Sequence, residues 1–184
     1  MHRMLIAALL SVSPVLVHAA GNFTLGSPDI GPGAIINSKY VFKGFGCEGG
    51  NVSPALQWSN APAGTQSFAI TAYDPDAPTG SGWWHWVVFD IPASATGLAE
   101  GAGNIRGTGL PAGSVQGRTD FGAPGYGGPC PPAGDKPHHY IFTVYALKVP
   151  KLQLDANASA AMVGFMLNAN QLGKTSFTAL YSRK

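Results

Sequence analysis

The stretch WWHWVVFDI, residues Trp83–Ile91, decides the fold class of this chain. It is almost continuously apolar and rich in aromatic and β-branched residues, which is typical of a central strand buried on both faces. A second run of the same kind, HHYIFTVYAL, covers His138–Leu147. Two such runs predict a mainly β domain built around a buried sheet.

Shorter apolar runs, separated by turns rich in Gly, Pro, Asn and Asp, fill the rest of the chain. The further strands that they predict are Lys39–Lys43, Ala55–Trp58, Ser67–Tyr73, Ser114–Arg118 and, near the end, Thr175–Ser182. No linker or internal repeat interrupts this pattern. We therefore expect a single domain over residues 20–184.

One segment has a different periodicity. Ala156–Leu172 is rich in Ala, Met, Leu and Asn, and its apolar residues recur at helical spacing. Asp155 is suited to the N-cap and Gly173 to the C-terminal stop. The sequence thus predicts a mainly β fold with one helix in the C-terminal region, followed by a final strand.

The charge content limits the partners of this protein. Of 184 residues only 11% are charged, with 11 Lys and Arg against 9 Asp and Glu. So small an excess does not form the basic surface that polyanion binding requires, and we expect no nucleic-acid partner. The length is suited to one substantial core.

The N-terminal residues predict export. Residues 1–19 combine a short positive start, a broken apolar stretch and small or apolar residues before Ala20, as in a secretory signal peptide. No later apolar run is long enough for a transmembrane segment. We therefore expect a periplasmic or secreted domain. In that compartment Cys47 and Cys130 predict a disulfide, the alternative being two buried thiols.

The histidines beyond the predicted leader fall in two short segments. His85 lies in the first strand quoted above, and His138 and His139 begin the second. Strand alternation places Trp83, His85, Val87 and Phe89 on one face of their strand, with Trp84, Trp86, Val88 and Asp90 on the other. It also separates His138 and Tyr140 from His139. The clustering predicts one shared polar pocket, in which protonated imidazoles would attract an anion.

Other interpretations of the same residues stay open. The Asp-Pro-Asp segment that begins at Asp74 also suits an Asx turn, and His85 also suits a core histidine satisfied by a backbone carbonyl. A zinc site from His85, His138 and Asp74 lacks a close ligand pair such as H-x-x-x-H. There is no serine elbow, P-loop or dinucleotide fingerprint, so we expect no metal and no cofactor.

Several of these motifs, in this order, resemble the phosphatidylethanolamine-binding protein family, also called the Raf-kinase-inhibitor-like family. They are Asp74-Pro75-Asp76-Ala77-Pro78, Trp83-x-His85, the Gly128 loop with Pro131-Pro132, and His138-x-Tyr140. The flanking segments Gly50–Pro54, Gly117–Gly122 and Gly125–Pro132 are similar to its bacterial branch. The resemblance extends from about Phe23 to Arg183.

The resemblance implies a β-rich fold with a small pocket for phosphate-like groups, including phospholipid headgroups, at one end of the sheet. The ligand-binding residues that it implies are Asp74, Pro78, Trp83, His85, Gly128, Pro131, Pro132, His138 and Tyr140. Two departures, His139 where Arg is frequent and Thr79–Gly82 where animal members carry charges, imply a shallower, more open pocket.

We therefore expect an exported, non-enzymatic binding protein for a small anionic or phosphorylated ligand. A hydrolase that uses a His–Asp pair in the same pocket is the alternative of a different class, although no separate nucleophile is evident. A peptidase inhibitor or interaction module is a third. The sequence leaves open whether the protein is a monomer or a homodimer.

Overall fold

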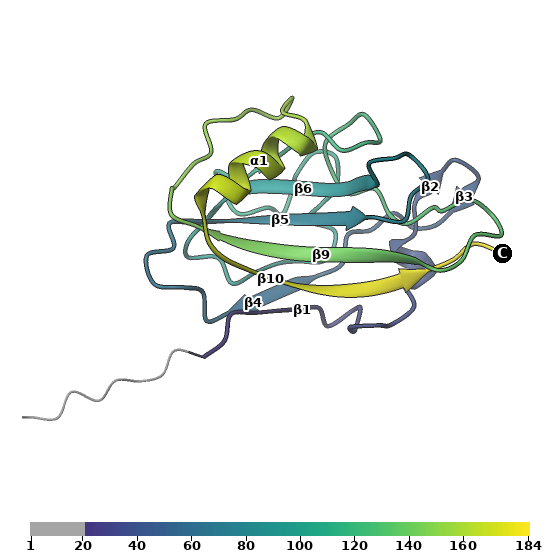
Figure 1. Ribbon diagram of the computed structural model, residues 1–184, viewed down its shortest axis with the longest axis horizontal. Helices are drawn as coiled ribbons and strands as arrows, with labels where there is room; N and C mark the ends of the chain where they lie inside the picture. The colour runs from purple at the N-terminus through teal and green to yellow at the C-terminus, as the bar shows by residue number, and fades with distance from the viewer. Residues whose placement is uncertain (1–20) are drawn as a thin grey trace, which may run out of the picture.

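Five antiparallel strands form the central sheet of the protein, which the computed structural model describes over residues 21–184 (Figure 1). The predicted signal peptide at 1–19 lies outside the described residues. The sheet has the order β10-β9-β5-β6-β8. Its strands are β5 (Ser67–Asp74), β6 (Trp83–Pro92), β8 (Val115–Gln116), β9 (His138–Leu147) and β10 (Gln171–Tyr181). The two apolar runs quoted above thus become β6 and β9, on either side of β5.

The helix and a second sheet lie on the two faces of this sheet, and a small hairpin lies at one end of it (Figure 1). A three-stranded sheet of order β1-β4-β7 and a two-stranded hairpin complete the β structure. Their strands are β1 (Thr24–Gly26), β4 (Leu56–Ser59), β7 (Gly97–Leu98), β2 (Lys43–Gly44) and β3 (Cys47–Glu48). The helix α1 (Ala160–Asn170) lies on one side of the central sheet in Figure 1, with β4 and β1 on the other.

Two apolar cores result from this layering. The larger core lies between the two sheets, where Leu56 and Trp58 of β4 pack with Trp86, Val88 and Phe142. The smaller core lies under the helix, where its members Val87, Phe89, Ala160, Val163 and Leu167 are buried. The strands are continuously apolar because each face of the sheet borders its own core.

The predicted division of faces along β6 holds from Trp86 to Phe89 and is wrong on either side of that stretch, because β6 contains two extra residues relative to β5. Ala72 pairs with Trp86 and Tyr73 with Trp84, so His85 has no partner of its own on β5. A second shift lies at Asp90, whose φ is 56°. Each shift interrupts strict alternation. As a result Val87 and Phe89 face the helix together with Trp84. His85 instead contacts Tyr140 in the inter-sheet core.

The predicted strand Lys39–Lys43 is also wrong in its first part. Ser38–Tyr40 forms a 3-10 helix, because the side chain of Asn37 accepts a hydrogen bond from the Lys39 N–H at 3.0 Å. Within the predicted range only Lys43 belongs to a strand, as the first residue of β2. The hydrogen bond from the capping side chain of Asn37 therefore outweighs the strand propensity of Ser38–Tyr40.

The helix and the final strand exist as predicted, with different bounds. Ser159, rather than Asp155, is the N-cap, since its hydroxyl accepts from the Met162 N–H at 3.2 Å. Asp155 closes a preceding turn, in which it accepts from the Asn157 N–H. The helix ends at Asn170 and β10 begins at the next residue, so Gly173 lies within the strand. Predicting a single mainly β domain with one late helix and a final strand was correct.

Candidate functional site

The ends of three neighbouring strands meet at one edge of the central sheet. β5 ends at Asp74, whereas β6 begins at Trp83 and β9 begins at His138. Because β5 is antiparallel to both neighbours, its last residues lie beside their first residues. Side chains from these ends, together with three loops, enclose a cavity of about 140 Å³.

The structure brings eight of the nine expected site residues to this cavity. They are Asp74, Pro78, Trp83, His85, Pro131, Pro132, His138 and Tyr140. Gly128 lies behind the wall instead, where its N–H donates to Asn51 Oδ1 at 2.8 Å. A Cβ atom at Gly128 would overlap the carbonyl oxygen of Tyr40, so only glycine fits there. Gly128 therefore positions the loop.

Five residues that were not predicted from the sequence as site residues also line the cavity. They are Phe45, Ala77, Thr79, Phe121 and Cys130. Phe121 contacts the rings of Trp83 and His85 edge to face, each at a centroid distance of 5.4 Å. Phe45 comes from a loop that no motif marks. Phe121 lies in the segment Gly117–Gly122, which the family resemblance covers but did not assign to the site, whereas Ala77 and Thr79 adjoin the Asp-Pro-Asp segment.

His85 is held by the loop that follows Tyr126. Its Nδ1 lies 2.7 Å from the carbonyl oxygen of Gly127, and the Gly127 N–H donates to the His85 carbonyl at 2.8 Å. The side chain is buried among aromatic rings. Burial lowers the pKa of His85, and the hydrogen bond to Gly127 only partly opposes this. The ring is therefore held neutral, contrary to the expectation of a protonated imidazole.

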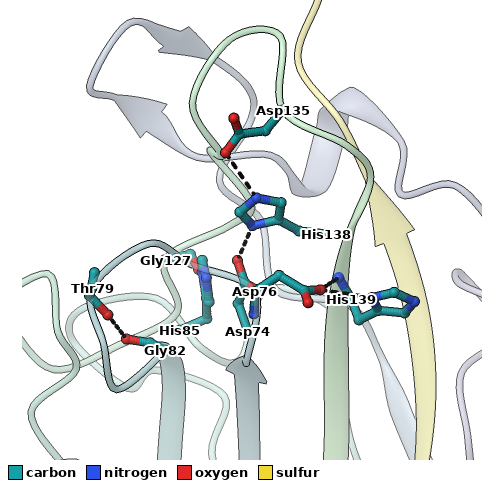
Figure 2. A network of polar contacts seen from close by, with 9 residues as sticks. All are labelled: Asp74, Asp76, Thr79, Gly82, His85, Gly127, Asp135, His138 and His139. Atoms are coloured by element: carbon teal, nitrogen blue, oxygen red, sulfur yellow. Dashed lines mark hydrogen bonds and ion pairs between the residues drawn. The ribbon is translucent and has the colours of Figure 1, made fainter.

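His138 has the opposite environment, as Figure 2 shows. Its Nδ1 lies 2.7 Å from Asp74 Oδ2, and its Nε2 lies 3.3 Å from Asp135 Oδ2. Burial by itself would lower the pKa of His138, but the hydrogen bond and the charge of Asp74 outweigh it, and the pKa is raised. Both ring nitrogens are thus occupied by carboxyl groups, and the ring is held as a cation.

The Asp-Pro-Asp segment connects this pair to the sheet. Asp74 Oδ1 accepts from the Asp76 N–H at 2.8 Å, which is the Asx turn that the sequence allowed. Asp76 in turn accepts from the backbone N–H and the ring Nδ1 of His139, both at 2.7 Å (Figure 2). These bonds lower the pKa of Asp76 against the opposing effect of burial. His139 itself is exposed, on the other side of β9 from His138.

Two hydrogen-bond donors at the cavity have no partner among residues 21–184. They are the hydroxyl group of Tyr140 and Nε1 of Trp83, and both atoms are buried. Burial raises the pKa of Tyr140, so its hydroxyl group keeps its proton. Buried polar groups usually have partners. An unpaired O–H and an unpaired N–H at one cavity therefore suit a ligand that offers acceptor atoms.

The predicted disulfide between Cys47 and Cys130 is present, with Cα atoms 6.0 Å apart. It joins the β2–β3 hairpin to the loop at the cavity wall. Arg183 contacts both sulfur atoms, with Nη1 at 3.3 Å from Cys47 Sγ and 3.5 Å from Cys130 Sγ. Three separate segments of the chain are thus fixed beside the cavity.

Other parts of the described structure are less suited to be the site. An open groove of about 1030 Å³ lies over the three-stranded sheet, but no charged or histidine side chain within residues 21–184 lines it. Within the same residues, no three His, Cys, Asp or Glu side chains gather as a metal site would require. No helix there has the length and hydropathy to cross a bilayer.

A sequence profile, two bacterial relatives and a crystal structure all match nearly the whole of this chain. The sequence profile described as Phosphatidylethanolamine-binding protein matches residues 26–182. UPF0098 protein YbcL of Escherichia coli K12 is 53% identical over 184 residues, 100% of each chain. UPF0098 protein YbhB of the same strain is 49% identical over 156 residues, 85% of this chain and 98% of its own. The crystal structure of E. coli YbcL matches with a TM-score of 0.88 and 57% identity, over 89% of this chain and 100% of that chain.

Proposed function

We propose, from the premise that the chain belongs to the phosphatidylethanolamine-binding protein family, that it is an exported, non-enzymatic protein that binds a small phosphate-bearing group. A phospholipid headgroup or another phosphorylated ligand would supply that group. The observation that carries the proposal is the pair of unpaired donors, Tyr140 O–H and Trp83 N–H, at a cavity that also contains two histidines.

The size of the cavity supports a small ligand. A volume of about 140 Å³ lies well below the roughly 300–1,000 Å³ of typical sites for drug-sized molecules and cofactors. It suits a tetrahedral phosphoryl group with a short substituent. Any larger part of the ligand would lie outside, against the exposed ring of Phe45 at the rim.

The charges around the cavity support a singly charged ligand. Asp74 and the imidazolium of His138 compensate each other at 2.7 Å, and the second carboxyl group at His138, that of Asp135, is half-exposed and screened by water. No Lys or Arg among the described residues lines the cavity. Neutral donors that are fixed in a dry environment would then provide most of the binding, since a hydrogen bond there is less weakened by water.

The contacts of the histidines weigh against the hydrolase alternative. A general base needs a free ring nitrogen within reach of the proton it removes. Both nitrogens of His138 are already bound by carboxyl groups. Within residues 21–184 Nε2 of His85 has no hydrogen-bond partner, but the cavity offers it no nucleophile. The Thr79 hydroxyl donates to the Gly82 carbonyl (Figure 2), and Cys130 is held in the disulfide.

Export is supported by the N-terminal sequence pattern and by the disulfide. Disulfides persist in oxidising compartments and are rare in the cytosol. The Cys47–Cys130 bond joins the β2–β3 hairpin to the loop at the cavity wall, so an oxidising compartment would keep these two segments of the site linked.

Calorimetric titration with methyl phosphate tests the proposed function. We expect saturable binding to the wild-type protein, and Tyr140→Phe should weaken it about tenfold, the loss of roughly one good hydrogen bond. Tyr145→Phe is the matched control, because Tyr145 lies on the same strand but packs against the helix-side core. Unchanged affinity in a folded Tyr140→Phe protein would contradict the proposal. So would release of p-nitrophenol from p-nitrophenyl phosphate, which would indicate a hydrolase.

A further inference from the structure

The hydrogen bond of His85 fixes which ring nitrogen carries the proton. A carbonyl oxygen can only accept, so Nδ1, at 2.7 Å from the Gly127 carbonyl, must be the donor. A neutral imidazole has a single N–H, and Nε2 then carries a lone pair. Nε2 makes no hydrogen bond within the described part of the chain, and the ring lines the cavity. The cavity therefore contains a hydrogen-bond acceptor on the β6 side.

The groups around the ring leave this acceptor without a donor. Asp74 approaches from β5, Tyr140 and His138 from β9, and Asp120 from the loop after β8. Asp74 and Asp120 offer acceptor oxygens, and the ring nitrogens of His138 are directed to carboxyl groups. The Tyr140 ring stands edge to face with His85, and its hydroxyl group lies near the Asp74 carboxyl group without a hydrogen bond of regular geometry. The hydrogen-bond donor to Nε2 would therefore have to come from the ligand.

We infer that His85 is a specificity-determining acceptor, which makes the pocket select an oxyanion that carries a proton, the monoanion of a phosphomonoester, over a proton-free oxyanion of the same shape and charge. The inference rests on the proposed phosphate-binding function. Of the two ligand sources named there it favours a phosphomonoester over a phospholipid headgroup, because the phosphodiester of a phospholipid carries no proton. The P–O–H of the ligand donates to His85 Nε2, and its other oxygens accept from Tyr140 and Trp83.

The physical basis of the selection is complementarity between donors and acceptors. A sulfate ester has the same tetrahedral shape and a single negative charge, but all its free oxygens are acceptors. One of them would face the lone pair of Nε2, which is repulsive and leaves a buried acceptor unpaired. Sites built to hydrogen-bond a hydroxyl group reject analogues that lack it far more strongly than apolar sites reject a change of size.

Methyl phosphate and methyl sulfate are matched probes for this inference. At pH 5.5 most methyl phosphate is a monoanion, because its second pKa is about 6, and methyl sulfate is a monoanion at every pH used. Calorimetry should give an affinity for methyl phosphate at least ten times that for methyl sulfate at pH 5.5. The ratio should fall as the pH rises to 8, since the phosphate ester then loses the proton that His85 accepts.

Two further measurements locate the effect at His85. His85→Phe should bring the two affinities together, whereas His139→Phe, on the exposed side of β9, should leave the ratio unchanged. Nitrogen-15 NMR of the wild-type protein without ligand at pH 7 should show His85 protonated at Nδ1 and unprotonated at Nε2. That spectrum does not depend on how well the His85→Phe protein folds.

The possible outcomes separate this inference from the proposed function. Equal affinity for the two esters at pH 5.5, or a proton on Nε2 in the free protein, would overturn the inference and leave phosphate binding intact. If neither ester binds, the inference and the proposed function are both overturned. Tighter binding of methyl phosphate that disappears in His85→Phe would support both.

Discussion

The two histidines that line the cavity lie in opposite electrostatic environments, one on the β6 side and one on the β9 side. On the β6 side, His85 donates to a backbone carbonyl, and burial lowers its pKa. On the β9 side, His138 lies between two carboxyl groups, and its pKa is raised. The rings line the same cavity, so the difference comes from their hydrogen-bond partners rather than from depth alone. A second layer of residues thus sets the charge of each side.

Removing Asp74 should have the largest effect on this contrast. Asp74→Ala takes the main partner from His138 Nδ1 and from the Asp76 N–H. Loss of one member of a buried pair costs roughly 3–5 kcal/mol, because the other member stays buried without compensation. Urea denaturation at pH 7 should show a decrease of that size in the free energy of unfolding. Asp74→Asn keeps one acceptor oxygen, so its free energy of unfolding should decrease clearly less. An equal decrease in the two variants would show that the charge of Asp74, and not its hydrogen bonds, is decisive.

Opening the disulfide should loosen the β6 side more than the β9 side. Cys130 belongs to the same loop as Gly127, which fixes the His85 ring. The Cys47→Ser/Cys130→Ser double variant should lose roughly 2–4 kcal/mol, the usual range for a bond closing a long loop. NMR should then show exchange broadening of the His85 ring signals and sharp His138 signals. Equal broadening of the His85 and His138 signals would show that the disulfide supports both sides of the cavity equally.

The pH dependence of stability should have opposite signs for the two histidines. The raised pKa of His138 gives stability that is fully present below about pH 6.5, the unfolded value, and is lost as the pH rises through the folded value. His138→Phe should therefore cost roughly 1.5–3 kcal/mol at pH 6, as for a hydrogen bond to a charged group, and less at pH 9.

For His85 the sign is reversed. A lowered folded pKa means that stability falls as the pH decreases from about 6.5 toward that lower value. The difference between wild type and His85→Phe should thus narrow at low pH. Urea denaturation of both variants from pH 5 to 9 checks these signs, and parallel curves for the two variants would contradict opposite protonation states.

The exposed pair His139–Asp76 should have the smallest effect. Their side chains are 55% and 41% exposed, so water and salt weaken the attraction between them. His139→Ala should change the free energy of unfolding by roughly 0.2–1 kcal/mol and leave methyl phosphate affinity unchanged. A loss of affinity would show that Asp76, through its contact with β9, also shapes the cavity.

The sequence predicted the central strands well, for a physical reason. Ser67–Tyr73, Trp83–Ile91 and His138–Leu147 border two cores, so nearly every side chain in them is apolar. Their ends bring Asp74, His85 and His138 together by antiparallel pairing alone. The family resemblance added the proline residues and Tyr140 to the expected site.

The features that were missed depend on one extra residue or on distant contacts. The shift that turns His85 to the same side as Trp86 has no local signature, because WWHW is compatible with either register. The neutral state of His85 depends on Gly127, which is 42 positions away. Phe45 and Phe121 line the cavity through loop conformation, which hydrophobic periodicity does not encode.

The strand order also has a consequence for how the protein folds. β5 and β6 are joined by the eight-residue loop 75–82, whereas Asp74 and His138 are 64 positions apart. Closing the longer loop costs more entropy, so we expect the β5–β6 hairpin to nucleate the sheet and β9 to dock later. The cavity would then be complete only at the end of folding. Pulse-labelled hydrogen exchange should show early protection in β5 and β6, and recovery of methyl phosphate binding should coincide with protection of β9.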